Sequence, residues 1–464
     1  MLAGCSDEVT QPLPLSRAPA ASAVIAVGDE RPDEAEMCAF AERIPGLGGY
    51  HFEDGELVVS LTDPSRADAA RAALAGVARR GNGRMRIKPA HYTFQQLRAW
   101  RDGWWDRILD VPGVSFVDLD EAANRVVVGL AEPAARARVL ELLRPSGIPV
   151  PALGFASAGY PQPHGGQVEY APYRNDAPSQ GDSITSYRRP LEGGLKISYR
   201  HSSDPTLSTA CTMGFIAVLN GVRVGITASH CSVRQWDLDN TSYFQAQPGA
   251  GRYFGYEYKD PNGHSCGFLS VNVCRGSEAS AVLLEGDVGA SLGYIVRPLG
   301  SPPLERSIYG VRQSSMLVDP ATPNFRIIGR GASDAGINVD KVGATTGWTR
   351  GKVRRTCVDV PADRPNSKLR CQYLASFSSA GGDSGAPVFA AHADGTASLM
   401  GINWGILMED GEEFAVYTSL GSIERDLGTL QFAPGSSPGT GGPGDGGETD
   451  PGDGGGNCPP SCVN

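Results

Sequence analysis

Turn-forming residues interrupt the chain at short intervals from about Leu191 to Phe432, and this punctuation limits what the stretch can fold into. Between these turns lie short apolar runs of strand length. Runs of this kind predict antiparallel strands in a sandwich or barrel. The chain has 464 residues, with 60 Gly, 34 Pro and only 20% charged residues. Its length and composition therefore predict two folded domains, one of them all-β.

Changes in composition divide the chain into five segments. The leader and the tail are rich in small residues and Pro, and the tail is expected to be disordered. The boundaries that we expect are 1–34 for the leader, 35–153 for a small α+β domain, 154–190 for a linker, 191–434 for the all-β domain, and 435–464 for a Gly/Pro-rich tail with a terminal Cys pair.

The α+β domain is predicted to contain two related halves, which begin at Ile44 and Val111. Each half has a Pro-Gly turn, an extended stretch, an apolar strand and a helix. Between the halves, Thr93 and Gln96 have the spacing of a capping box at the start of a helix. The tryptophans of this domain are expected to pack in its core.

Eight of the ten cysteines form four closely spaced pairs. Close spacing in loop-rich surroundings favours disulfides in an oxidising compartment. A zinc site is the alternative, but none of the four pairs has CxxC-type spacing with His in register. The sequence therefore predicts an exported protein with these disulfides: Cys211 with Cys231, Cys266 with Cys274, Cys357 with Cys371, and Cys458 with Cys462. Cys5 and Cys38 are left over.

The stretch Leu2-Ala3-Gly4-Cys5 resembles a bacterial lipobox, in which the cysteine is lipidated after a signal peptide is removed. The charged and apolar regions that precede such a cysteine are missing, so either the sequence starts late or the match arose by chance. No run of 18 or more apolar residues exists, so a lipid on Cys5 is the one expected membrane attachment. The net charge of -10 argues against nucleic-acid binding.

A histidine follows a predicted hairpin in the stretch CTMGFIAVLNGVRVGITASHC, which begins at Cys211. Asn220-Gly221 is typical of a type I′ turn between two strands. The returning strand delivers His230 at its end, and a bridge between Cys211 and Cys231 would hold the hairpin beside it. This pattern singles out His230 as a candidate for chemistry.

A serine lies in the glycine-rich stretch SSAGGDSGAPVF, which begins at Ser378. A serine hydroxyl becomes a nucleophile when a base takes its proton and backbone N–H groups hold the developing oxyanion. Glycines around Ser384 permit a tight loop in which the N–H groups of Gly382 and Ser384 point at one spot.

Four stretches occur in one order: TASHC from Thr227, GATTGWTRGKV from Gly343, GGDSGAPVF from Gly381, and GINWG from Gly401. Because of these four stretches, the second domain resembles the bacterial chymotrypsin-fold serine proteases, and is similar to streptogrisins and α-lytic protease. Ser229 departs from the Ala or Gly of many relatives. The resemblance implies two six-stranded antiparallel β-barrels with the active site between them. It also implies that residues 35–153 are a pro-domain, a folding helper and inhibitor that is cleaved off.

The resemblance implies roles for the residues that match its motifs. His230 would be the general base, Ser384 the nucleophile, and Gly382 and Ser384 the donors of the oxyanion hole. Asp383 would be structural.

Substrate-binding positions follow from the same resemblance. Asn403, Trp404 and Gly405 would form the wall along which the substrate backbone lies. Ser378 would lie at the base of the specificity pocket. Because Ser378 carries no charge, an apolar or small P1 side chain is expected rather than Lys or Arg.

The triad also needs a buried carboxylate, which fixes the histidine tautomer and stabilises the imidazolium. Glu278, Glu285 and Asp287 lie in the right part of the chain. Asp287 has the usual residue type, but the stretch after it is a poor strand. Glu278 precedes the apolar run ASAVLL and lies four residues after Cys274, where related sequences carry Asp. We therefore predict Glu278 as the acid of the triad, with Asp287 as the alternative. Because glutamate is one methylene longer than aspartate, reduced activity is a consequence to test.

The sequence thus predicts a secreted or cell-envelope serine endopeptidase, made as a zymogen, that acts through an acyl-enzyme on Ser384. Its expected partners are a peptide or protein substrate and its own pro-domain, and it is expected to be a monomer without a cofactor. The alternatives are a non-catalytic homologue that binds peptides, and an esterase on the same fold.

Overall fold

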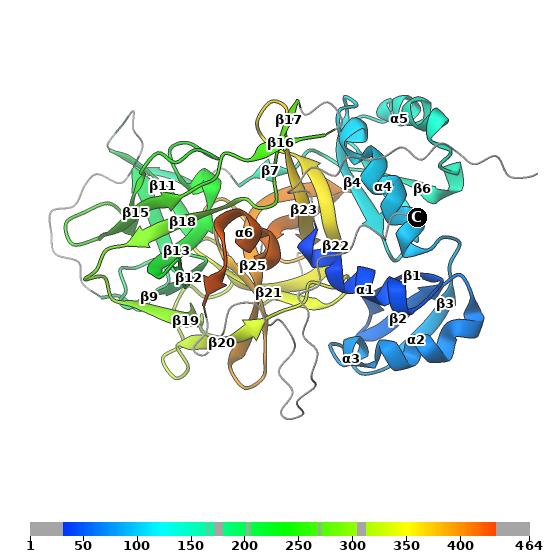
Figure 1. Ribbon diagram of the computed structural model, residues 1–464. Coiled ribbons are helices and arrows are strands. Elements are labelled where there is room, and N and C mark those ends of the chain that lie inside the picture. Colours follow the sequence, from blue (N-terminus) through cyan, green and yellow to red (C-terminus); the bar gives the residue numbers. More distant parts are fainter. Residues whose placement is uncertain are drawn as a thin grey trace, which may run out of the picture.

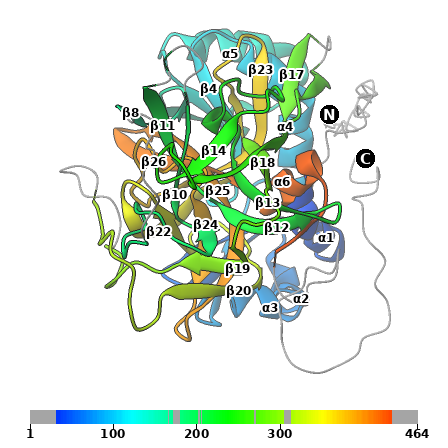
Figure 2. The same ribbon diagram turned by 90° about the vertical axis from the view of Figure 1, so that its left-hand side faces the viewer.

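The computed structural model describes residues 31–164, 167–170, 180–200, 204, 206–267, 271–303 and 312–432. Strands predominate, and helices are concentrated in the N-terminal region. Figure 1 shows a first barrel at the left, a second barrel in the centre and the N-terminal region at the right. Figure 2 views the molecule from the side of the first barrel.

The N-terminal region has two halves with the same topology. In each half two strands form an antiparallel hairpin, and a third strand runs parallel to the second. The strands are β1 (Leu47–Glu53), β2 (Glu56–Leu61) and β3 (Met85–Pro89), then β4 (Val114–Asp120), β5 (Arg125–Leu130) and β6 (Leu153–Ser157). The alternation of apolar residues in both hairpins buries their faces in one core.

Helices connect the strands of these halves. They are α1 (Ala35–Arg43), α2 (Ala67–Ala73), α3 (Ala75–Ala78), α4 (Phe94–Leu109) and α5 (Ala135–Leu143); α6 (Leu420–Leu427) lies near the other end. The capping box forms at α4: Thr93 Oγ1 accepts from Gln96 N, and Gln96 Oε1 accepts from Thr93 N. Within the ranges described, no helix has the length and apolar character needed to cross a membrane.

The first barrel is a closed ring of six antiparallel strands. Its members are β10 (Lys196–Arg200), β11 (Leu207–Thr212) continuing into β12 (Phe215–Leu219), β13 (Val222–Ala228), β18 (Ala279–Leu284), β15 (Tyr253–Lys259) and β14 (Ser242–Gln245). The bend between β11 and β12 keeps backbone hydrogen bonds to the chain on both sides of it. Met213 N donates to Leu195 O, and Gly214 N donates to Ile226 O. Asn220 and Gly221 both have positive φ, as the predicted type I′ turn requires.

The second barrel is also a closed antiparallel ring. Its strands are β21 (Asn338–Gly343), β22 (Gly347–Pro361), β23 (Ser367–Ala375), β26 (Glu412–Ser419), β25 (Thr396–Glu409) and β24 (Pro387–Ala391). The predicted fold class, two six-stranded antiparallel β-barrels after a small α+β region, is confirmed by these strand pairings.

Further strands lie at the edges of the barrels. They are β7 (Gln162–Pro163), β8 (Gln167–Tyr170), β9 (Leu191–Gly193), β16 (His264–Cys266), β17 (Asn272–Arg275), β19 (Ala290–Val296), β20 (Asn324–Arg330) and β27 (Leu430–Gln431). The stretch expected as a linker thus contains β7 and β8. The stretch after Asp287, expected to be a poor strand, contains β19, because pairing with β20 and β9 supplies its backbone partners.

Ion pairs join the N-terminal region to the second barrel. Arg355 Nη1 on β22 donates to Asp118 Oδ2 on β4 at 2.7 Å, and both side chains are buried. Lys368 Nζ on β23 donates to Asp110 Oδ1 at 2.7 Å. Strand β4 also pairs with β22. The N-terminal region is therefore docked on one side of the second barrel.

Three of the four predicted disulfides are formed: Cys211–Cys231, Cys266–Cys274 and Cys357–Cys371. The remaining predicted pair, Cys458 with Cys462, and the lipidation candidate Cys5 lie outside the described residues. Cys38 is buried, and Arg98 Nη1 donates to its Sγ at 3.0 Å.

Candidate active site

The two barrels each contribute one member of a close histidine–serine pair. His230 lies in the short 3₁₀ turn that follows β13, and Ser384 lies in the loop before β24. His230 Nε2 is 2.7 Å from Ser384 Oγ. Ser384 is fully buried. A histidine nitrogen at this distance can accept the proton of the hydroxyl.

Glu278 lies directly before β18, and the pairing of β18 with β13 brings it to His230. Its Oε1 is 3.2 Å from His230 Nδ1 and accepts the backbone N–H of His230 at 3.3 Å. Glu278 is fully buried. Asp287 is exposed in the turn after β18, and nearby Glu285 Oε1 accepts from the hydroxyl of Tyr253. The structure therefore brings Glu278, and not Asp287, to the histidine.

Two side chains that the sequence did not single out hold Glu278. Trp236 Nε1 donates to Oε2 at 2.5 Å, and Gln235 Nε2 donates to Oε1 at 2.7 Å. Burial opposes ionisation of Glu278, but the hydrogen bond and charge of His230, the charge of Arg275 and the bond from Trp236 outweigh it. The pKa of Glu278 therefore lies below its ordinary value, and the carboxylate is ionised at neutral pH.

A buried ion pair lies behind this carboxylate. Arg275 Nη1 donates to Asp260 Oδ1 at 2.7 Å, and the guanidinium lies over the ring of Trp236. Ser229 Oγ donates to Asp260 Oδ2 at 2.7 Å and accepts the backbone N–H of Trp236 at 2.9 Å. The hydroxyl of Ser229 therefore links the buried ion pair to the backbone of Trp236.

The loop that carries Ser384 is anchored through its neighbour Asp383. Lys341 Nζ donates to Asp383 Oδ2 at 2.9 Å, and neither side chain is exposed. Thr346 Oγ1 and the backbone N–H of Thr345 donate to the same carboxylate. Burial opposes ionisation, but the charge of Lys341 and these hydrogen bonds keep the pKa of Asp383 below its ordinary value.

Glycines allow this loop to pack closely. Gly385 has a φ of +85°, and a Cβ there would overlap Thr227 Oγ1 on β13. Gly382, one of the predicted oxyanion donors, has its carbonyl turned to Thr212, whose Oγ1 donates to it at 2.8 Å. The loop is thus fixed against the first barrel on the side of His230.

The predicted substrate-binding residues line the second barrel beside Ser384. Ser378 is buried, and its carbonyl accepts from Thr349 Oγ1 at 2.9 Å. Asn403 Nδ2 donates to Asp383 O at 3.2 Å, so Asn403 ties β25 to the Ser384 loop. Trp404 and Gly405 follow on β25, and their backbones face another segment of the chain.

That segment comprises residues 162–164, which no sequence motif places beside Ser384. Pro163 lies opposite Gly405 in an antiparallel pairing. His164 N donates to Trp404 O at 3.1 Å, and His164 O lies 3.1 Å from Ser384 Oγ. Because these contacts use backbone groups, no side-chain pattern announces them.

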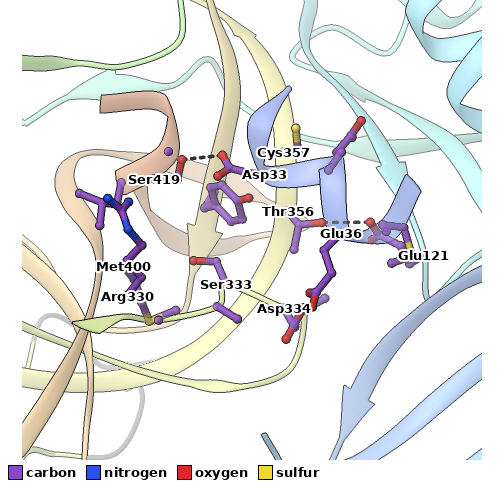
Figure 3. Close-up of a pocket in the computed structure, with 18 of the residues that line it drawn as sticks. Asp33, Glu36, Glu121, Arg330, Ser333, Asp334, Thr356, Cys357, Met400 and Ser419 are labelled. Atoms are coloured by element: carbon purple, nitrogen blue, oxygen red, sulfur yellow. Dashed lines mark hydrogen bonds between the residues drawn. The ribbon is translucent and has the colours of Figure 1, made fainter. Parts of the chain in front are cut away.

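A separate cavity of about 260 Å³ lies between the N-terminal region and the second barrel (Figure 3). Asp33 and Glu121 point into it from the N-terminal region. Asp33 Oδ2 accepts from Ser419 Oγ at 2.5 Å, and Glu121 Oε1 accepts from Thr356 Oγ1 at 3.1 Å. The residues that line this cavity do not include the histidine–serine pair, so it belongs to the docking interface.

Comparison with protein-family models found no match, and comparison with curated proteins found none either. Solved structures of bacterial proteases are similar in fold. Nocardiopsis protease is 18% identical over 53% of this chain and 99% of its own, with a TM-score of 0.35. Thermobifida fusca protease A is 16% identical over 53% and 99%, with a TM-score of 0.33. Cellulomonas bogoriensis chymotrypsin is 18% identical over 52% and 97%, with a TM-score of 0.33. Similarity at these sequence identities and TM-scores does not assign an activity to this chain.

Proposed function

We propose that the protein is a serine endopeptidase that acts through an acyl-enzyme on Ser384. The observation that carries this proposal is a line of three groups, in which half-buried His230 has the buried Ser384 Oγ at one ring nitrogen and buried Glu278 at the other. This arrangement matches the roles of nucleophile, base and orienting acid.

Each residue of the site has a distinct task in the reaction. Ser384 Oγ attacks the substrate carbonyl while His230 Nε2 takes its proton. Glu278, kept ionised by its hydrogen bonds, stabilises the imidazolium that forms. The backbone N–H groups of Gly382 and Ser384 receive the negative charge on the carbonyl oxygen. His230 then gives the proton to the leaving amine, and water releases the acyl group.

The second barrel is suited to hold a peptide in extended form. Strand β25 pairs with residues 162–164 through the backbone of Trp404 and Gly405, and a peptide that takes the place of this segment would gain main-chain hydrogen bonds as an antiparallel strand. Ser378 at the base of the proposed pocket is uncharged, so a preference for Lys or Arg has no electrostatic support there.

We further propose that the enzyme is exported, as its disulfides favour, and is made as a zymogen. Residues 35–153 would be the pro-domain, which helps folding and inhibits the site. The chain would function as a monomer in the cell envelope or outside the cell, with Cys5 as the position of any lipid anchor. Residues 191–434 expressed without 35–153 should therefore fold poorly.

Labelling with a fluorophosphonate tests the activity. The secreted product of the full chain should be labelled at Ser384, and the Ser384→Ala variant should not. Absence of label together with retained peptide binding would favour the non-catalytic homologue. Rapid hydrolysis of simple esters without hydrolysis of peptide amides would favour the esterase.

A further inference from the structure

We propose that Asp426 is a positioning residue of this site, which holds the backbone before Glu278 so that its carboxylate meets His230. The inference rests on the proposed function and adds to it a residue that none of the sequence motifs includes. Asp426 lies in the last turn of α6, beside β18 and β25 (Figure 1), and its side chain is only 10% exposed. Its hydrogen bonds go to the two residues directly before Glu278 and not to the reacting groups.

The residues that carry the acid cross from one barrel to the other. Strand β17 ends at Arg275 and runs parallel to β23 of the second barrel, while β18 begins at Ala279 and pairs with β13 of the first barrel. Residues 276–278 are the connection, which we call the crossing. Because Glu278 lies on the crossing and Ser384 belongs to the second barrel, the alignment of the triad depends on how the crossing is held.

Asp426 holds the crossing through three hydrogen bonds to one carboxylate oxygen. Oδ2 accepts from Gly276 N at 3.1 Å, from Ser277 N at 2.7 Å and from Ser277 Oγ at 2.8 Å. Hydrogen bonds to a charged acceptor are about twice as strong as neutral ones. With both N–H groups fixed, the backbone that leads into buried Glu278 is held in one orientation.

The helix itself does not explain a carboxylate at this position. The last turn of a helix carries the negative end of the helix dipole, so an acid there is unfavourable. Asp426 therefore does not stabilise α6 by its charge. Its favourable contacts lie outside the helix, on the crossing.

The crossing is also held on its other face by the second barrel. The carbonyl of Gly276 accepts from Gln372 Nε2 on β23 at 2.8 Å and from Thr418 Oγ1 on β26 at 3.2 Å. A Cβ at Gly276 would overlap the guanidinium of Arg425, the neighbour of Asp426 on α6. The crossing is therefore packed directly against both α6 and the second barrel.

Asp426 also adjoins the arginine beside the acid. Arg275 Nε lies 3.7 Å from Asp426 Oδ2, and Arg275 Nη2 donates to the carbonyl of Ala279 at 2.7 Å. The charge of Arg275 is one of the causes that keep the pKa of Glu278 below its ordinary value. Loss of Asp426 would therefore loosen both the backbone before Glu278 and the cation near it.

Steady-state kinetics of the secreted product of the full chain test the proposal. In Asp426→Ala we expect kcat for a chromogenic peptide amide to fall about 100-fold, as displacement of a reacting group by about 1 Å does. KM should change less than about twofold, because the peptide binds along β25 and the acid acts in the transition state. Asp426→Asn keeps one neutral acceptor oxygen, so its kcat should lie between those of the parent and Asp426→Ala.

A double variant shows whether Asp426 acts through the acid. Adding Asp426→Ala to Glu278→Gln should lower kcat less than about threefold further, because residues that act as a unit are not additive. A merely structural role would lower kcat by the same factor in both backgrounds.

Glu424→Ala is the matched control on the same helix. Glu424 binds Arg330 Nη1 and Nη2 at 2.6 Å, and neither residue contacts the crossing. Its loss should destabilise the attachment of α6 and leave kcat near that of the parent. Circular dichroism checks that each variant folds. If Asp426→Ala does not fold, Asp426→Asn is compared with Glu424→Gln, and a lower kcat in Asp426→Asn is the expected result.

The outcomes separate this inference from the proposed function. A parent-like kcat in Asp426→Ala, an equal fall in Glu424→Ala, or a full additional loss in the double variant overturns the inference and leaves the endopeptidase intact. Equal kcat values in Asp426→Asn and Glu424→Gln do the same where Asp426→Ala does not fold. A parent chain that neither hydrolyses the peptide nor reacts with a fluorophosphonate at Ser384 overturns both.

Discussion

The indole N–H of Trp236 donates a 2.5 Å hydrogen bond to Glu278 Oε2, while the other carboxylate oxygen of Glu278 faces His230. A glutamate has one more rotatable bond than an aspartate, and fixing it costs conformational entropy. Trp236 and Gln235 fix the carboxylate, so the longer side chain is held in position beside His230.

The carboxylate charge of Glu278 is predicted to be essential. In the Glu278→Gln variant the neutral amide does not stabilise the imidazolium, so kcat should fall on the order of 10³- to 10⁴-fold. The fold should survive, because the amide is close to the same size. The measurement is hydrolysis of a chromogenic peptide amide, with circular dichroism as the check on folding.

Asp287→Asn is the matched control, since Asp287 is exposed in the turn after β18. Its activity should stay within about twofold of the parent, because surface substitutions have small effects. A collapse in Asp287→Asn with normal activity in Glu278→Gln would show that the other acid serves His230.

Loss of the indole donor should change the pH dependence of activity. Trp236→Phe removes one of the groups that lower the pKa of Glu278, so that pKa rises. The acid limb of kcat/KM should move to higher pH, and activity at neutral pH should fall about tenfold, as expected for a hydrogen bond to a charged group. Trp348→Phe is the control, because Trp348 donates to buried Asp340 in the second barrel. If the acid limb of kcat/KM is unchanged in Trp236→Phe, then Trp236 does not position the Glu278 carboxylate.

Local chemistry explains which parts of the site the sequence predicts. The hairpin that delivers His230 depends on the turn at Asn220-Gly221, and the loop of Ser384 depends on nearby glycines, so short motifs suffice for both. The apolar strand that follows Glu278 favours it over the other acids. These features are encoded within a few residues of the group that they position.

The remaining parts depend on residues that are distant in sequence. Trp236 and Gln235 lie in a loop without periodic pattern, and their contact with Glu278 exists only once β13 and β18 pair. Residues 162–164 bind β25 through backbone groups, which every sequence supplies. For both reasons the sequence predicts the reacting groups better than the groups that surround them.

The buried pair of Lys341 and Asp383 is predicted to be a major source of stability. Lys341→Met leaves the Asp383 carboxylate buried without its cation, which costs about 3–5 kcal/mol in the free energy of unfolding. Because Asp383 adjoins Ser384, the variant should also label poorly with a fluorophosphonate. Unfolding in urea is measured on the Ser384→Ala background, which lacks the proposed nucleophile and so cannot cut chains during the measurement.

An exposed ion pair provides the comparison for Lys341→Met. Arg144 binds Glu141 at the surface, beyond the end of α5. Arg144→Gln should cost less than about 1 kcal/mol, as exposed pairs do. If Lys341→Met and Arg144→Gln lose the same free energy of unfolding, the buried pair does not contribute more to stability than the exposed pair.

Asp33 should make the stability of the docked N-terminal region depend on pH. Burial raises its pKa to about 6 from an ordinary 3.8, against the opposing effects of the Ser419 hydrogen bond and the charge of Arg425. Below pH 4 the carboxyl is protonated in the folded and the unfolded chain. Between pH 4 and 6 the folded chain alone keeps the proton, so this contribution to stability is lost as the pH rises through 6.

The Asp33→Asn variant keeps a neutral side chain at every pH and tests this sign. On the Ser384→Ala background, its free energy of unfolding relative to the parent should rise between pH 4 and pH 7. Asp68→Asn is the control, because Asp68 is fully exposed and its substitution should give a flat difference. A flat difference for Asp33→Asn, or one that falls with pH, would contradict a raised pKa in the folded chain.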